Sequence, residues 1–223
     1  MNRSPALIFD LDGTLVDTAP DLLGALNAIL VREGRRPVRR PDLRHLVGHG
    51  ARTMLAEALA QTGGPLPEPR TIELIDAFIA WYREHLVDGS RPFPGVERTL
   101  KNFVEAGARL GVLTNKPQEL ADPLLDRLDL ARYFTAIHGA GRFSYVKPDA
   151  RVFHHVVDDV GGEGAGAIMI GDSTTDYRTA RAAGVPVILL TYGYTPDPVE
   201  TLGADAVTGD FTELPALVAR ILK

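Results

Sequence analysis

The segment ALIFDLDGTLVDT, Ala6 to Thr18, joins a short apolar run to two closely spaced carboxylates. The apolar residues 6–9 have the composition of a buried strand, and the run stops at Asp10, with Asp12 two residues later. A carboxylate at the end of a buried strand is costly unless a cation or hydrogen-bond donors compensate its charge. The segment therefore predicts a strand that delivers two acidic groups to a functional site.

Composition limits what kind of protein this can be. The chain has 223 residues, 45% of them hydrophobic, which suits one large domain or a domain with a smaller one inserted. The net charge is −5 and the basic cluster RRPVRR at 35–40 is local, so we expect neither nucleic acid nor a membrane as partner. Cysteine is absent, which excludes disulfides, thiolate metal ligands and a cysteine nucleophile. We expect a soluble, cytoplasmic protein; its oligomeric state stays open.

Helical spacing dominates the part of the chain after Thr18. Leucine, isoleucine and other apolar residues recur every three or four positions over 22–30, 54–59 and 72–86. Loops rich in glycine and proline separate the last two of these segments and end the stretch at Gly95. We therefore expect about three helices between the first strand and the rest of the chain.

From residue 96 onward the pattern alternates between helices and strands. We predict helices over 96–106, 117–128, 149–160 and 175–183, and strands over 108–114, 136–138, 167–172 and 185–190, followed by a short strand and a last helix. Such alternation favours a parallel sheet with helices on both faces, which the first strand joins. The predicted fold class is α/β: a Rossmann-like core formed by 1–15 and 92–223, with an inserted all-helical cap domain formed by 16–91.

Polar side chains stand where ligands bind in such a sheet, outside the carboxyl ends of the strands. They are Asp10 and Asp12 after the first strand, Thr114 and Asn115 after ARLGVLT, Asp172 and Asp176 after AIMIGD, and Lys147 in SYVKPDA. Taken singly, each could be an ordinary cap, turn or surface residue. Taken together, they place several carboxylates, a hydroxyl and an ammonium group around one crevice.

A divalent cation and a phosphate would make chemical sense of this set. Asp10, Asp12 and Asp172 would repel one another, whereas Mg²⁺ prefers oxygen ligands and keeps positions open for water and phosphate oxygens. Lys147 adds positive charge, and the backbone N–H groups around Gly13 could surround phosphate oxygens. We therefore expect a magnesium-dependent enzyme whose partner is a small phosphate ester.

Four motifs in this order carry a family resemblance: FDLDGTLVDT, LTNKP, VKPDA and GDSTTD. They resemble the signature of the haloacid dehalogenase superfamily, in the phosphatase branch that has a small helical cap inserted after the first motif. The resemblance implies a phosphatase that works through an aspartyl-phosphate intermediate. Asp12 favours phosphoester chemistry within this superfamily, because its members that act on carbon–halogen bonds or phosphonates usually have a non-acidic residue there.

The resemblance also implies roles for the acidic residues. Asp10 would be the nucleophile, and Asp12 the general acid and base. Asp10, the backbone carbonyl of Asp12 and the carboxylate of Asp172 would be the protein ligands of Mg²⁺. Asp176 would support the metal waters or Lys147 from behind this ligand set.

The remaining implied roles concern the phosphoryl group. Thr114 and the backbone of Asn115 would bind it during transfer, and Lys147 would neutralise its charge. This division suits phosphoryl transfer, which depends on in-line positioning and on charge compensation at the equatorial oxygens.

The expected cap contains LVGHGARTML, Leu46 to Leu55, which resembles the cap segment of phosphoglycolate phosphatases within this superfamily. The resemblance implies a turn at Gly48 and Gly50, followed by a helix on which Arg52 pairs with the carboxylate of a small acidic substrate. The alternative is that Arg52 is a solvent-facing residue at a helix start.

The leading hypothesis is hydrolysis of 2-phosphoglycolate to glycolate and phosphate. A sugar-phosphate mutase of the β-phosphoglucomutase type is the alternative enzyme class, and a nucleoside monophosphate or pyrophosphate is an alternative substrate. A non-catalytic binding module of the same fold is a third possibility, which the presence of all the expected catalytic groups disfavours.

Overall fold

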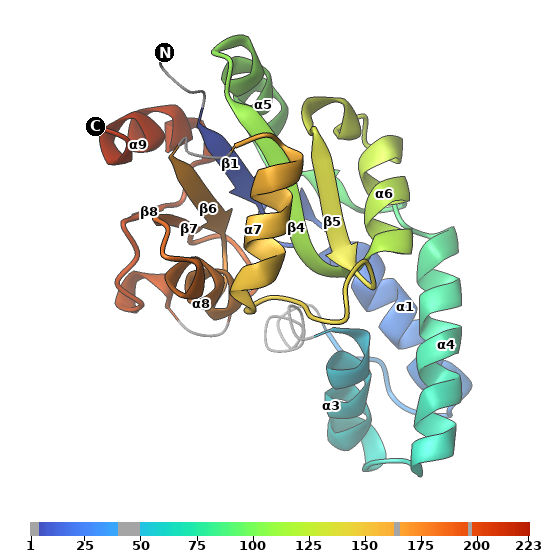
Figure 1. Ribbon diagram of the computed structural model, residues 1–223. Helices are drawn as coiled ribbons and strands as arrows, with labels where there is room; N and C mark the ends of the chain where they lie inside the picture. Colours follow the sequence, from blue (N-terminus) through green and yellow to red (C-terminus); the bar gives the residue numbers. More distant parts are fainter. Residues whose placement is uncertain (1–4, 40–49, 163–165, 196–197) are drawn as a thin grey trace.

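The computed structural model describes residues 5–39, 50–162, 166–195 and 198–223, and its centre is a parallel sheet (Figure 1). The strands lie in the order β5-β4-β1-β6-β7-β8, with bounds β1 Ala6–Phe9, β4 Arg109–Pro117, β5 Ala136–Ala140, β6 Ala167–Gly171, β7 Val187–Leu190 and β8 Ala206–Thr208. The prediction that the first strand joins the sheet is confirmed, and β1 lies in its middle, parallel to β4 on one side and to β6 on the other.

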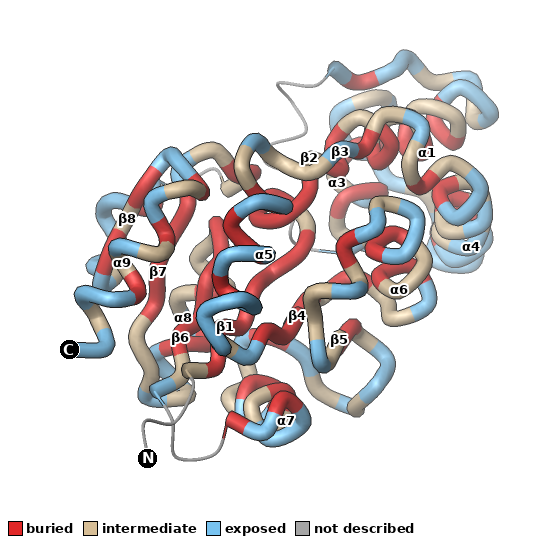
Figure 2. The backbone as a smooth tube through the Cα atoms, turned by 90° about the horizontal axis from the view of Figure 1, so that it is seen from above, coloured by how far each residue is buried: buried red, intermediate tan, exposed pale blue. Residues whose placement is uncertain are grey.

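Helices cover both faces of the sheet, as predicted from the alternating pattern. They are α5 Val96–Glu105, α6 Gln118–Arg127 and α9 Leu214–Ile221 on one face, and α7 Ala150–Asp159 and α8 Thr174–Ala183 on the other. Successive side chains of a strand point to opposite faces, and β1 divides accordingly. Leu7 and Phe9 pack with the first group of helices, and Ala6 and Ile8 pack with the second. Figure 2 shows the strands buried between helices whose outer sides are exposed.

Phe9, the last residue of β1, is fully buried and is surrounded by aromatic rings. Its ring centroid lies 6.4 Å from that of Phe103, 6.2 Å from Phe134 and 6.0 Å from Phe211. These contacts come from α5 and from two loops that are distant in the sequence, so they fix the carboxyl end of β1 in three directions. The next residue, Asp10, therefore starts from a rigid position.

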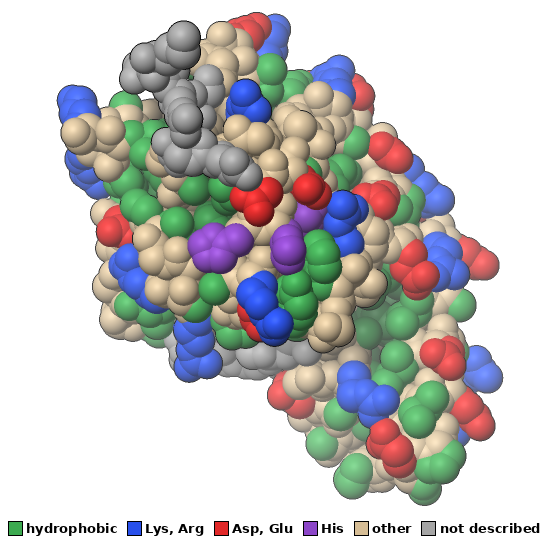
Figure 3. All heavy atoms as spheres, viewed as in Figure 1, with side chains coloured by type: hydrophobic (Ala, Val, Ile, Leu, Met, Phe, Trp, Pro, Cys, Tyr) green, Lys and Arg blue, Asp and Glu red, His purple; other side chains and the backbone are tan. Residues whose placement is uncertain are grey.

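Three helices form a separate lobe, which we call the helical lobe: α1 Ala19–Arg32, α3 Ala51–Gly63 and α4 Glu68–Glu84. They pack on one another and project from the core (Figures 1 and 3). The chain enters the lobe through β2, Val16–Asp17, and returns through β3, Arg91–Pro92. These two strands pair antiparallel, so the two connections lie side by side. The division of the chain into a core and an inserted cap domain at 16–91 stays a prediction, and the arrangement of the helical lobe in Figure 1 is consistent with it.

The surface is mixed in charge on the face drawn in Figure 3, where acidic and basic side chains alternate over the core and the lobe. Among the described residues, none of the helices has the length and apolar character needed to cross a membrane.

One strand differs from the prediction in a way that affects the site. β4 continues to Pro117 rather than ending at Thr114, and its register against β5 shifts between Leu113 and Pro117. A β-bulge of this kind bends a strand and redirects its side chains. Thr114, Asn115 and Lys116 occupy the irregular part.

Candidate functional site

The carboxyl ends of β1, β4 and β6 open into a cavity of about 340 Å³ between the sheet and the helical lobe. Lobe residues, among them Met54, Phe78 and Tyr82, line one wall. The wall formed by the core contains most of the residues predicted from the sequence: Asp10, Asp12, Thr114, Asn115, Lys147 and Asp172. The expectation that polar strand ends gather at one edge of a parallel sheet is thus realised.

Three buried carboxylates meet at the base of this cavity. Asp10, Asp172 and Asp176 each place a carboxylate oxygen within 4.8 Å of the others. The ammonium group of Lys147 lies between two of them, 2.9 Å from Oδ1 of Asp10 and 2.6 Å from Oδ1 of Asp176. The lysine side chain is only 2% exposed, so this positive charge is held by its two acidic partners and not by water.

The cluster changes the proton affinity of its members. Burial raises the pKa of Asp10 to about 6; the charge of Lys147 opposes this rise and that of Asp176 adds to it. The pKa of Asp172 lies well above its usual range, because the carboxyl is buried and faces Asp176 and Asp10. Burial alone would lower the pKa of Lys147, but the charges of Asp10 and Asp176 outweigh it and raise that pKa. Without an added cation, the site therefore has an excess of negative charge.

Asp176 is the most completely hydrogen-bonded carboxylate of the cluster. Its Oδ1 accepts from Lys147, and its Oδ2 accepts from Ser173 Oγ at 2.7 Å and from the backbone N–H groups of Ser173 and Asp172. Ser173 and Asp176 form a capping box at the start of α8. Asp176 thus anchors the helix and the lysine at once, which fits the predicted supporting role better than direct metal ligation.

Asp172 is oriented by two donors from distant parts of the chain. Thr14 Oγ1 donates to its Oδ1 at 2.8 Å, and the backbone N–H of Tyr194 donates to its Oδ2 at 2.9 Å. Gly13 has φ +84°, and a Cβ there would lie 2.6 Å from Oδ2 of Asp172. Glycine is therefore required at position 13 both by the backbone conformation and by the space that the carboxylate occupies.

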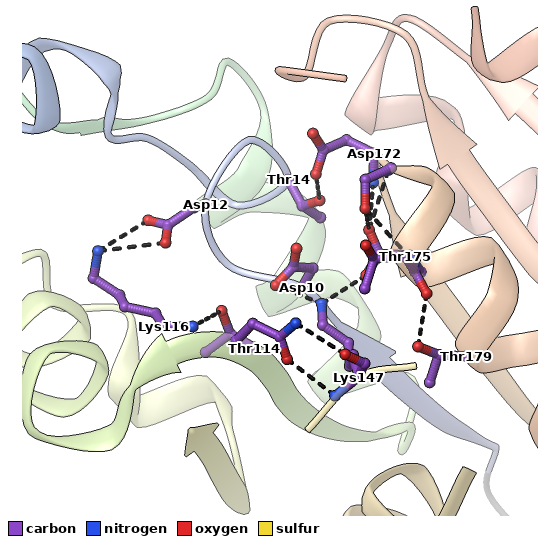
Figure 4. A network of polar contacts seen from close by, with 12 residues as sticks. Asp10, Asp12, Thr14, Thr114, Lys116, Lys147, Asp172, Thr175 and Thr179 are labelled. Carbon is purple, nitrogen blue, oxygen red and sulfur yellow. Dashed lines mark hydrogen bonds and ion pairs between the residues drawn. The ribbon is translucent and has the colours of Figure 1, made fainter. Parts of the chain in front are cut away.

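Asp12 points in a different direction from the other acids. Figure 4 shows its carboxylate turned away from Asp10 and toward Lys116. The Nζ of Lys116 lies 3.1 Å from Oδ1 and 3.4 Å from Oδ2 of Asp12, and it also donates to the hydroxyl of Tyr82 at 2.7 Å. No role for Lys116 follows from the LTNKP motif alone, since a lysine after a strand is usually solvated. Its position at the carboxyl end of a parallel strand, shared with Thr114, was the available signal.

Thr114 and Asn115 support the site through contacts within the core. Thr114 is 4% exposed, and its hydroxyl accepts from the backbone N–H of Lys116 at 3.1 Å. The side chain of Asn115 bonds both backbone groups of Lys147, donating to the carbonyl at 3.1 Å and accepting from the N–H at 3.0 Å. The bulged end of β4 thereby sets the position of Lys147 from 32 residues away in the sequence.

Two site expectations concern groups whose contacts the structure shows but whose ligands it does not contain. The N–H of Gly13 donates to the carbonyl of Val16 at 3.0 Å and closes a turn. Binding of phosphate oxygens by the backbone N–H groups around Gly13 stays a prediction. Arg52 is 59% exposed and pairs with Glu68 at 2.6 Å; it does not line the cavity. Its pairing with a substrate carboxylate stays a prediction. Gly48 and His49 lie outside the described residues, while Gly50 precedes α3 with φ +84°.

The residues present fit a hard divalent cation. Oδ1 of Asp10 is buried and has no hydrogen-bond donor with good geometry, although Lys147 lies close enough to form an ion pair. Because Lys147 shares its single charge between Asp10 and Asp176, the cluster needs a further cation or a proton to balance its third carboxylate. Asp10 and Asp172 together offer only oxygen ligands, the type that Mg²⁺ prefers.

Comparison with known proteins agrees with this site. A family model described as haloacid dehalogenase-like hydrolase matches residues 7–190, and the chain belongs to this family. A phosphoglycolate phosphatase of Caulobacter vibrioides is 46% identical over 216 residues, which cover 97% of this chain and 91% of that protein. One from Agrobacterium fabrum is 46% identical over 220 residues, covering 98% and 94%.

Comparison of the fold with solved structures points to the same class of protein. A crystal structure of a predicted phosphoglycolate phosphatase from Haemophilus somnus superposes with a TM-score of 0.89 at 28% identity, covering 98% of this chain and 99% of that one. The resemblance noted from the four motifs is confirmed, and the chain is a phosphatase of this family.

Replacement of Asp10 by asparagine should stabilise the metal-free protein at neutral pH. Because the pKa of Asp10 is raised to about 6 from the 3.8 of a free carboxyl, folding is favoured by this group below pH 3.8 and the benefit is lost as the pH rises through 6. Above pH 6 the buried charge costs on the order of 2–3 kcal/mol. We expect a melting temperature several degrees above wild type at pH 7.5 for Asp10→Asn, and a smaller gain at pH 5.

Differential scanning calorimetry in the presence of a chelator measures this gain, and exposed Asp158→Asn is the matched control. Added Mg²⁺ should then stabilise wild type more than Asp10→Asn. An unchanged or lower melting temperature for Asp10→Asn at pH 7.5 would show that the charge of Asp10 is compensated without a metal.

Proposed function

We propose that this phosphatase hydrolyses 2-phosphoglycolate in two steps, with Asp10 as the nucleophile and Mg²⁺ as the cofactor. The observation that carries the proposal is the position of Asp10, at the rigid end of β1, 2.9 Å from the ammonium group of Lys147 and beside Asp172. A carboxylate held in this way faces a cavity in which a phosphoryl group would meet positive charge.

In the first step, an oxygen of the Asp10 carboxylate attacks phosphorus, and the bond between phosphorus and the glycolate oxygen breaks. The glycolate oxygen keeps the electron pair and takes a proton from Asp12. In the second step, water attacks the phosphorus of the aspartyl-phosphate and gives its proton to Asp12. The Asp10–phosphorus bond breaks, and orthophosphate and the original carboxylate are formed.

The other core residues position and neutralise the transferring group. Lys147 can balance charge on the phosphoryl oxygens from its buried position, and the hydroxyl of Thr114 lines the same cavity as Asp10. Asp10, the backbone carbonyl of Asp12 and Asp172 would hold Mg²⁺, which supplies further compensation of phosphoryl charge when bound. Asp176 keeps Lys147 in place from behind.

The relatives and the basic side chains of the cavity support 2-phosphoglycolate as the substrate. Relatives that match nearly the full chain are named phosphoglycolate phosphatases. Among the described residues, three basic side chains line the cavity; Lys116 and Lys147 pair with aspartates, whereas Arg178 has no acidic partner. Thr174, one helical turn earlier on α8, has a buried hydroxyl oxygen without a hydrogen-bond partner in the described structure. Both groups could bind the carboxylate of a small phosphorylated acid.

Phosphate release from 2-phosphoglycolate tests the reaction directly. We expect turnover that depends on Mg²⁺, a loss of roughly 10³-fold or more in Asp10→Asn, and a protein-bound phosphate that hydroxylamine releases from the quenched wild-type enzyme. Exposed Asp158→Asn serves as the control and should behave as wild type. Activity that survives chelation, or that persists in Asp10→Asn, would contradict the proposal.

Replacement of Arg178 by methionine tests the proposed carboxylate contact. A charged hydrogen bond of this kind contributes about 1.5–3 kcal/mol, so kcat/KM for 2-phosphoglycolate should fall about 10- to 100-fold. Ethyl phosphate, which has the same two-carbon chain but a methyl group in place of the carboxylate, should be hydrolysed equally by both proteins. Arg151→Met, whose exposed guanidinium pairs with Asp149 outside the cavity, is the control. An equal loss with both esters, or no loss with either, would remove Arg178 from substrate recognition.

A further inference from the structure

Lys116 connects the helical lobe to the predicted general acid and base. The lysine side chain is 3% exposed and contacts two groups: the carboxylate of Asp12 in the core and the hydroxyl of Tyr82 on α4. The Nζ also lies 4.4 Å from the centroid of the Tyr82 ring. The connection between core and lobe at this point is therefore made by a buried charge and not only by apolar packing.

The placement of Lys116 is determined on the core side by the bulge at the end of β4. Its backbone N–H donates to Thr114 Oγ1 at 3.1 Å, and the register shift between Leu113 and Pro117 turns this segment over the cavity. Asp12, by contrast, has a side chain that is 18% exposed and, in the described structure, receives side-chain hydrogen bonds from Lys116 alone. Its orientation thus depends on the lysine.

The placement of Lys116 on the lobe side is determined by Tyr82. Tyr82 is 1% exposed and stacks on Phe78 of the same helix, with ring centroids 6.1 Å apart. Its hydroxyl is therefore at a fixed position on α4. Any displacement of α4 from the core removes this acceptor from Lys116, and a buried ammonium group that loses an acceptor must find another one.

We propose that Lys116 is a positioning residue that holds the Asp12 carboxylate for proton transfer, and that the hydrogen bond with Tyr82 makes this orientation depend on the docking of α4. The inference rests on the proposed function, because it assigns Lys116 to the step in which Asp12 gives its proton to the leaving oxygen. A simple structural role for a buried lysine would need only a compensating carboxylate. The additional contact with a lobe residue is what links orientation to docking.

Substrates with different leaving groups distinguish a positioning role of Lys116 from a simple structural role. Glycolate is a poor leaving group, so its oxygen must be protonated as the bond to phosphorus breaks. The p-nitrophenolate released from p-nitrophenyl phosphate is a good leaving group and needs no proton. The value of kcat/KM reports the first irreversible step, transfer of the phosphoryl group to Asp10. Loss of correct positioning of Asp12 should therefore lower kcat/KM for 2-phosphoglycolate and leave p-nitrophenyl phosphate much less affected.

We expect Lys116→Met to lower kcat/KM for 2-phosphoglycolate about 10- to 100-fold, within the range that general acid catalysis contributes. For p-nitrophenyl phosphate the loss should be several times smaller, and Asp12→Asn should show the same selectivity in a stronger form. Tyr82→Phe keeps the buried ring and removes only the hydroxyl, so its effect should be smaller with the same selectivity. Lys116→Arg should restore part of the activity.

A double-mutant cycle tests whether Tyr82 acts through Lys116. Tyr82→Phe should add little loss in the Lys116→Met background if both residues act on Asp12 along one path. The matched controls are Lys101→Met and Tyr133→Phe, whose side chains pair with Glu105 and Glu97 on the outer surface. Melting temperatures establish that each variant is folded.

Three outcomes would overturn the inference: equal losses with both esters, wild-type kinetics in Lys116→Met, or fully additive effects in the double variant. Each of these leaves the proposed function intact, since it is compatible with full dependence on Asp10 and Mg²⁺. A wild-type enzyme that hydrolyses neither ester, or an active Asp10→Asn, would instead overturn the proposed function together with the inference.

Discussion

The structure of this site depends on the burial of Lys147 between Asp10 and Asp176. Three carboxylates within 4.8 Å of one another could not share a buried site on their own, and the lysine makes two of them tolerable. Burial, together with the charges of neighbouring carboxylates, raises the pKa values of Asp10 and Asp172. Under the proposed function, the same imbalance that costs stability in the metal-free protein would favour binding of a divalent cation and of a phosphoryl group that approaches with it.

Much of the fold serves to hold these charges in place. The aromatic rings around Phe9 fix the end of β1, the capping box of α8 fixes Asp176, and the side chain of Asn115 fixes the backbone of Lys147. Each support comes from a different element of the sheet or its helices. Functional carboxylates at strand ends can therefore be held precisely by groups from several elements.

The sequence was sufficient to predict that the first strand joins the sheet, that helices cover both faces and that Asp10, Thr114, Lys147 and Asp172 gather at one edge, because periodicity and parallel topology determine these features. It was not sufficient to predict the hydrogen-bond or ion-pair partner of each polar group. The N–H of Gly13 closes a turn, Arg52 pairs with Glu68, and Lys116 turns into the cavity at a bulge. Local hydrogen bonding and a one-residue irregularity decide these contacts, and neither leaves a periodic signal.

In the proposed mechanism, two buried lysines divide the site into two functional halves. Lys147 serves the side where phosphorus is attacked: it contacts Asp10, and its position is set entirely by the core, through Asp176 and Asn115. Lys116 serves the side where the leaving oxygen departs: it contacts Asp12, and its position is shared between the core and the helical lobe.

This division has a consequence for how the two halves respond to movement. In the proposed mechanism, displacement of the helical lobe would leave the Asp10 nucleophile and Lys147 unchanged, since no lobe residue in the described structure forms a hydrogen bond or an ion pair with either side chain. It would alter only the group that transfers protons. If the proposed roles hold, the attacking carboxylate is prepared whether or not α4 is docked, whereas the orientation of the acid and base is completed only by docking.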